Sequence, residues 1–78
     1  MAVHLVAHKE IDTVGVVRYG LYDAARRRVG ELVFDPVTGS IVHEDDDRPV
    51  VGFVWIAAKL IKVHRETGCT PELITHVA

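Results

Sequence analysis

Histidine and aspartate side chains offer the first candidates for chemistry in this sequence. His4 and His8 are four residues apart, the spacing of metal ligands on a helix. In a strand, which rises about 3.3 Å per residue, they lie roughly 13 Å apart, too far to share an ion. The other three histidines have no acidic or cysteine neighbour at a ligand spacing, apart from Glu44 beside His43. We therefore expect structural or surface histidines, no metal site and no cofactor.

The acidic run Asp45–Asp47 could bind a hard cation such as Mg²⁺ or Ca²⁺. It lacks the spaced ligands and the glycine of an EF-hand loop. The run also precedes Arg48 and Pro49, and carboxylates at this place stabilise the positive end of a helix dipole. We therefore expect a helix start, with Asp47 or Arg48 as the N-cap.

Arg26, Arg27 and Arg28 form the basic cluster of the chain. On a hairpin tip they could contact phosphates, which gives affinity without sequence readout. The net charge of −2 and the aromatic content of 6% argue against nucleic acid as a main partner. The sequence favours a solvated turn, with a nucleic-acid-associated regulatory module as an alternative. In self-association, this cluster could also face Asp45–Asp47 of a second copy.

Cys69 is the single cysteine, so no intrachain disulfide can form. Thr70 and Pro71 after it resemble the start of a second helix, and a helix N-terminus lowers a thiol pKa. With His64 or His76 nearby, a Cys69-dependent enzyme or redox sensor is a further alternative. A single cysteine is usually inert, so we expect no enzyme and no catalytic residue.

Length and composition indicate one domain over residues 1–78. The N-terminus lacks the basic leader of a signal peptide, and no uncharged run approaches the ~20 residues of a membrane span. We expect a cytoplasmic protein with no membrane contact. Domains this small are commonly stabilised by disulfides, metals or oligomerisation, and of these three the sequence leaves oligomerisation. A well-packed monomer is the alternative, since many domains of this size fold unaided.

The predicted fold class is α+β: a three- to four-stranded antiparallel meander, one long helix packed on one face, and a short C-terminal element. Strand-like patterns cover Val3–Ala7, Val14–Tyr22, Val29–Phe34 and Ser40–Glu44, and Lys9–Thr13 resembles a turn. The segment Asp35–Gly39 predicts a hairpin turn, because Pro36 presets φ and Gly39 can adopt a left-handed conformation.

A register follows from setting Tyr22 opposite Val29 in an antiparallel pair. Tyr19 then lies opposite Leu32, and Val17 opposite Phe34, which gives one apolar face. On the other face Arg18 lies diagonal to Glu31, close enough to form an ion pair. A one-residue slip would scramble both patterns, so their agreement supports the register. The returning strand places Ile41 near Phe34.

The long helix is expected over Pro49–Thr67, ended by Gly68. Pro71–Val77 forms either a short helix or a terminal strand, and the caplike residues favour the helix. The helix stripe expected to face the sheet comprises Val50, Phe53, Val54, Ala57, Leu60, Ile61 and His64.

The helix has a second apolar face. In a helix that packs only on a sheet, the side chains that point away from the sheet would be polar. This face carries Val51, Trp55 and Ala58, and Trp55 is the only tryptophan. The C-terminal segment could fold over it, a second subunit could cover it, or it could be exposed. Tryptophan is the residue type most enriched at interface hot spots. We predict an interface at these residues, with the outer sheet face, which carries Val14, Val16, Tyr22, Val29 and Val33, as the second candidate.

The leading hypothesis is therefore a small non-enzymatic protein-interaction module that forms a homodimer. Another protein could also be the partner. The sequence identifies neither that protein nor a pathway.

Overall fold

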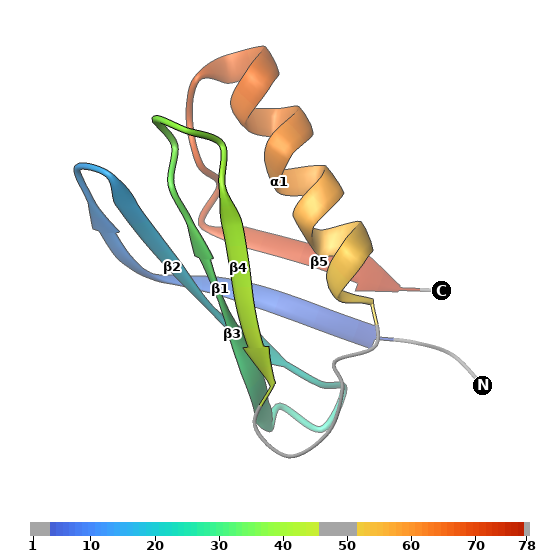
Figure 1. The fold of residues 1–78 in the computed structure, drawn as a ribbon. Helices are drawn as coiled ribbons and strands as arrows, with labels where there is room; N and C mark the ends of the chain where they lie inside the picture. The colour runs from blue at the N-terminus through green and yellow to red at the C-terminus, as the bar shows by residue number, and fades with distance from the viewer. Residues whose placement is uncertain (1–3, 46–51, 78) are drawn as a thin grey trace.

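The computed structural model describes residues 4–45 and 52–77. This part of the chain forms an antiparallel sheet of five strands with one helix on one face (Figure 1), which confirms the α+β class. Its elements are β1 (His4–Thr13), β2 (Val16–Tyr22), β3 (Arg28–Phe34), β4 (Ile41–Asp45), α1 (Phe53–Thr67) and β5 (Leu73–Val77). The strand order is β4-β3-β2-β1-β5, so the predicted meander of β1 to β4 gains a fifth strand beside β1.

The C-terminal segment is a strand, and the preference for a helix there is wrong. β5 pairs antiparallel with β1, with Ala7 opposite Ile74 and His8 opposite Leu73. The pairing buries Ile74, which is 5% exposed, in the core beside Ala7. Thr70 therefore caps no second helix. Pro71 lies before the strand, where its missing N–H costs no ladder hydrogen bond.

Strand β1 is longer than expected, and the prediction of a turn at Lys9–Thr13 is wrong. The chain turns later, at Gly15, whose φ of 84° favours glycine. β1 contains a bulge between Lys9 and Ile11, at which Glu10 is the extra residue. Residues three apart in a regular strand point to opposite faces. The bulge puts Lys9 and Asp12 on the same face, which lets their side chains meet at 2.9 Å.

The predicted register of β2 and β3 is confirmed over most of the pair. Tyr19 lies opposite Leu32, and Val17 lies opposite Phe34. The ion pair of Arg18 with Glu31 also forms, with Nε 3.7 Å from Oε2.

The pairing of Tyr22 with Val29 is wrong, because a second bulge sets Tyr22 opposite Arg28. The extra residue lets Val29 pack against the core while the Arg28 side chain reaches carboxylates on the opposite face. One register shift thus allows Val29 to pack on the covered face and Arg28 to form ion pairs on the uncovered face.

The predicted hairpin turn between β3 and β4 is confirmed. The Gly39 N–H donates to the Asp35 carbonyl at 2.8 Å, and Gly39 has a φ of 77°. The Asp35 carboxylate accepts the N–H of Val37 at 2.9 Å. Ile41 lies opposite Phe34, as expected.

Helix α1 begins at Phe53, with Gly52 as its N-cap in a left-handed conformation. The N-cap of α1 is Gly52 rather than the predicted Asp47 or Arg48, which lie outside the described residues. The residues predicted to begin the helix, through Val51, lie outside the described residues. The C-terminal end is confirmed, because the Gly68 N–H donates to the His64 carbonyl at 2.8 Å with a φ of 73°.

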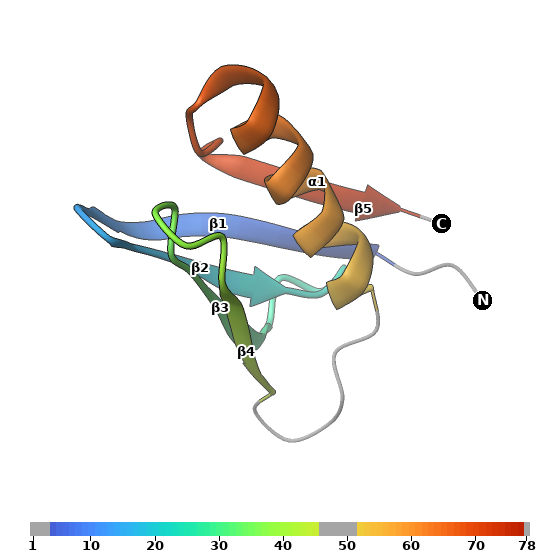
Figure 2. The ribbon, with the colours of Figure 1, turned by 45° about the horizontal axis from the view of Figure 1, so that its top comes forward.

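The core lies between α1 and one face of the sheet, as Figure 2 shows. It contains Leu5, Ala7, Val17, Tyr19, Leu21, Leu32, Phe34, Ile56, Leu60 and Ile74. Phe53, Ala57 and Leu60 take part, as predicted. The prediction for Val54 is wrong, since it is 69% exposed, and Ile56 is buried instead. Within the described residues, no helix is long and apolar enough to cross a membrane.

Candidate functional site

Trp55 lies on the side of α1 that passes over β5. Its ring stacks on the imidazole of His76, with centroids 5.0 Å apart and an interplanar angle of 10°. The contact covers only part of the indole, because Trp55 remains 55% exposed. The chain's own C-terminal strand therefore accounts for one face of the tryptophan, and solvent contacts the rest.

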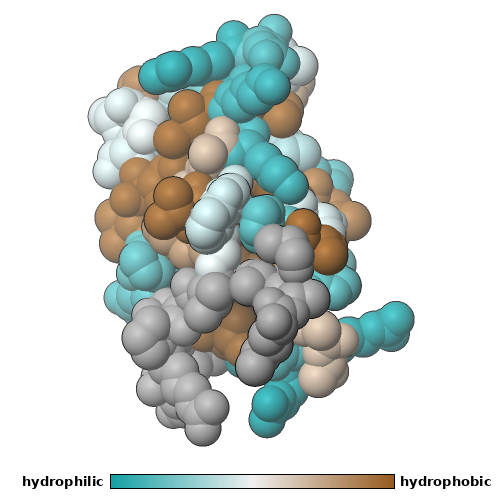
Figure 3. Space-filling model, turned by 90° about the vertical axis from the view of Figure 1, so that its right-hand side faces the viewer, coloured by the Kyte–Doolittle hydropathy of each residue, from teal (hydrophilic) through white to brown (hydrophobic). Residues whose placement is uncertain are grey.

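The residues next to Trp55 on α1 extend this exposed surface. Ala58 and Val54 are exposed, whereas Val51 lies outside the described residues. We call Val54, Trp55, Ala58 and His76 the Trp55 surface. Figure 3 views the side of the molecule on which β5 ends, and hydrophobic groups there lie between hydrophilic ones.

Lys59 protects the edge of β5 next to the Trp55 surface. Its Nζ donates to the backbone carbonyl of Thr75. The β1–β5 register, with the Lys9 N–H donating to Glu72 O at 2.9 Å, leaves this carbonyl on the outer edge of the strand. A lysine at an exposed edge opposes strand addition. A partner is therefore better received by the Trp55 side chains than by the β5 backbone.

The sheet face opposite α1 carries an alternating chain of charges. Arg28 connects two carboxylates: its Nη1 contacts Glu10, and its Nη2 lies 3.4 Å from Glu31. Glu31 in turn pairs with Arg18, and the hydroxyl of Tyr22 donates to Glu10 at 3.1 Å. The hydrogen bond to Glu10 is the main reason that the pKa of Arg28 is raised.

Gly20 makes room for the centre of this chain of charges. A Cβ at this position would lie 2.4 Å from both Arg28 Nη1 and Glu10 Oε2. The ion pair therefore lies directly over the backbone of β2. Because Val16 and Val33 flank charges that are already paired, the outer sheet face is less suited than the Trp55 surface to receive an apolar partner.

The three consecutive arginines do not act as one group. Arg27 pairs with Asp23, with Nε 3.7 Å from Oδ2, and Arg28 is held by Glu10 and Glu31. Arg26 is exposed and makes no ion pair within the described part of the chain. Only Arg26 therefore has an uncommitted guanidinium in the turn between β2 and β3.

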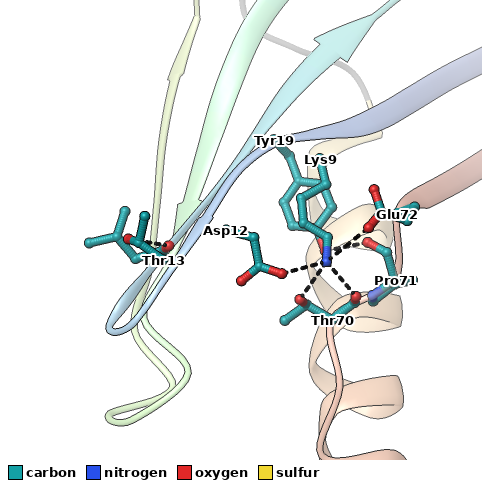
Figure 4. A network of polar contacts seen from close by, with 8 residues as sticks. Lys9, Asp12, Thr13, Tyr19, Thr70, Pro71 and Glu72 are labelled. Carbon is teal, nitrogen blue, oxygen red and sulfur yellow. Dashed lines mark hydrogen bonds and ion pairs between the residues drawn. The ribbon is translucent and has the colours of Figure 1, made fainter.

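Lys9 holds the segment between α1 and β5 in place, a role that the sequence patterns did not reveal (Figure 4). Its side chain is 7% exposed, and Nζ lies 2.9 Å from Asp12 Oδ2, 2.9 Å from Thr70 O and 3.4 Å from Glu72 Oε1. The hydrogen bond to Asp12 is the main cause of a raised Lys9 pKa. The cation thus pairs with two carboxylates and links β1 to the segment between α1 and β5.

Tyr19 completes this network from the core side. Its hydroxyl donates to the carbonyl of Pro71 at 2.7 Å. Burial is the main cause of a raised pKa for this phenol. Every polar group of this network that faces the core has a partner, so the network is a structural clamp, which we call the Lys9 clamp.

Cys69 is exposed and shares a shallow groove with His64 and Lys9. The helix expected after it is absent, because β5 follows, and the electrostatic reason for an activated thiol is therefore lost. His64 packs edge-on against Phe34, with centroids 5.1 Å apart. His76 stacks on Trp55 instead.

Among residues 4–45 and 52–77, no three His, Cys, Asp or Glu side chains are grouped so that they could hold a metal ion. Comparisons of the chain with protein-family models, with curated proteins and with solved structures found no match.

Proposed function

We propose that this protein is a small non-enzymatic interaction module that forms a homodimer through the Trp55 surface. The single observation that carries the proposal is the half-exposed indole of Trp55, which rests on His76 with its outer face open. Large aromatic side chains in such positions are the usual centres of protein interfaces.

A second copy is the partner that the size of the chain favours. The 78 residues have one cysteine and so no internal disulfide, and a dimer would supply additional burial of the kind that commonly stabilises small domains. A two-fold contact would place the Trp55 surfaces of both copies against each other. A standard interface buries about 800 Å² per partner, so the contact extends from Trp55 along α1 and β5.

The experiment measures the solution mass by light scattering between about 10 and 500 μM. The expected mass is twice the 8.6 kDa of one chain. Trp55→Glu should raise the dissociation constant about 30-fold or more, because losing a hot-spot residue costs about 2 kcal/mol or more. Circular dichroism should show an unchanged fold, because the side chain replaced is exposed.

Two variants make this test specific. Val37→Glu is the matched control, because Val37 is 81% exposed in the β3–β4 turn, which lies toward the C-terminal end of α1 whereas Trp55 lies in its first turn (Figure 1). It adds the same charge and should leave the mass unchanged. Ala58→Glu should weaken the dimer while it keeps Trp55 as a fluorescent reporter. Equal masses for Trp55→Glu and wild type at every concentration would reject the proposal.

A further inference from the structure

A groove crosses the uncovered sheet face where β1 begins and where the β2–β3 turn lies. His4 and His8 of β1, Tyr22 of β2 and Arg26 of the turn line it. His8 meets Tyr22 edge-on, with ring centroids 5.4 Å apart. The groove is built by described residues alone and lies on the opposite side of the sheet from α1.

The two carboxylates in the groove are already neutralised. Glu10 accepts hydrogen bonds from Arg28 and from the Tyr22 hydroxyl. Asp23 Oδ1 accepts the N–H of Ala25 at 2.9 Å and that of Arg27 at 3.0 Å, and Oδ2 faces the Arg27 guanidinium. Arg27 and Arg28 do not line the groove themselves. The positive charge of Arg27 balances that of Asp23, and the positive charge of Arg28 lies against Glu10.

The cationic group that remains is the guanidinium of Arg26. Within the described part of the chain it has no carboxylate partner. Arg26 also has a φ of 64°, the one positive φ of a non-glycine residue there. Its N–H donates to the Asp23 carbonyl at 3.0 Å, which holds the turn in this conformation.

A second nitrogen donor, His4, lines the same groove as Arg26. Val6 lies opposite Tyr22, the last residue of β2, so His4 lies toward the end of the sheet at which the β2–β3 turn begins. Along β1 the lining continues from His4 through Val6, which lies opposite Tyr22, to His8. One end of the groove therefore offers Arg26 and His4, and the other end offers apolar and aromatic side chains.

We propose that this groove binds a phosphomonoester that carries a flat apolar ring. The phosphate is held by the Arg26 guanidinium, with His4 as a further hydrogen-bond donor, since arginine matches the geometry of phosphate oxygens. The ring lies over Val6 and Tyr22 and meets the imidazole of His8. This site is separate from the Trp55 surface and does not depend on the dimer.

The test titrates the full ¹⁵N-labelled chain with phenyl phosphate, inorganic phosphate and phenol at low salt, followed by NMR. Saturable shifts should be confined to the amides of β1, Tyr22 and the 23–27 turn. Phenyl phosphate should bind about ten-fold or more tightly than either fragment, because each fragment lacks one of the two contacts. Arg26→Gln should weaken phenyl phosphate about ten-fold or more, as expected when a charged hydrogen bond is lost.

Arg65→Gln is the matched control, because it removes the same charge from an exposed site in the last turn of α1. It should leave the affinity unchanged. Equal weakening by both substitutions would show general charge attraction and overturn the proposal. No saturable shift up to 20 mM phenyl phosphate would overturn it too, and so would inorganic phosphate binding as tightly as phenyl phosphate.

Discussion

On the face of the sheet that α1 covers, Tyr19, Leu21 and Leu32 are excluded from solvent. On the opposite face the same strands carry Arg18 and Glu31, which pair with each other. The covered face stabilises the fold by burial, whereas the centre of the uncovered face pairs Arg18 and Arg28 with Glu10 and Glu31. The one tryptophan, which is 55% exposed, therefore lies not on the broad sheet face but at the side of α1.

The largest expected difference between the faces comes from neighbouring residues of β3. Leu32→Ala should destabilise the protein by about 3 kcal/mol, because it leaves a cavity at a fully buried position. Val33→Ala on the other face should cost less than about 1 kcal/mol. Urea unfolding measures both values. Equal losses would contradict the division into two faces.

The Lys9 clamp should contribute next. Lys9→Met keeps the aliphatic stem but leaves Asp12 and Thr70 without their cation, and should cost about 2 kcal/mol. The folded-state pKa of Lys9 is raised above 10.5, so the stabilisation is full below pH 10.5 and is lost as the pH rises through the folded-state pKa.

Tyr19 shifts in the same direction from 10.0, because burial disfavours its phenolate, so it adds to the alkaline loss. Unfolding free energies measured from pH 8 to 12 should therefore fall more steeply for wild type than for Lys9→Met. Parallel pH curves for the two proteins would show that the clamp does not contribute through the charge of Lys9.

The smallest expected effect lies on the uncovered face. Arg28→Gln removes the link between Glu10 and Glu31 and should cost about 0.5–1 kcal/mol, because partly exposed ion pairs contribute little. The loss should shrink in 0.5 M salt, which screens such pairs. A salt-independent loss as large as that of Leu32→Ala would mean that this face is a second core.

Local patterns in the sequence predicted the middle of the sheet well. The β2–β3 register and the Asp35–Gly39 turn depend on residues close in the chain, where alternation and turn chemistry act directly. The Arg18–Glu31 pair follows from the same register. The two bulges were not predicted. The positions of the extra residues Glu10 and Val29 depend on side-chain contacts that form on both faces only once the whole sheet is assembled.

Long-range pairing explains the remaining errors. For β5 the sequence allows a helix or a strand and favours the helix, because Thr70 and Pro71 resemble a cap. The strand forms because this segment pairs with β1, which is distant in the sequence. With β5 in the sheet, α1 is oriented so that Ile56 points into the core and Val54 points to solvent. The clamp around Lys9 depends on the same pairing, so no local signal could predict it.

Of the interface residues predicted from the sequence, Trp55 and Ala58 are exposed on α1. The contact of Trp55 with His76 could not be predicted without β5. For Arg26, Arg27 and Arg28, the sequence favours a solvated turn, with joint phosphate binding as the alternative. In the structure, carboxylates from β1, β3 and the turn pair with Arg27 and Arg28 and leave Arg26 apart from them.

The solution mass of wild type and of Trp55→Glu, measured side by side with Val37→Glu, tests the central claim most directly. We expect a dimer for wild type and Val37→Glu and a mass near 8.6 kDa for Trp55→Glu at the same concentration. A wild-type protein that stays monomeric at 500 μM would contradict it.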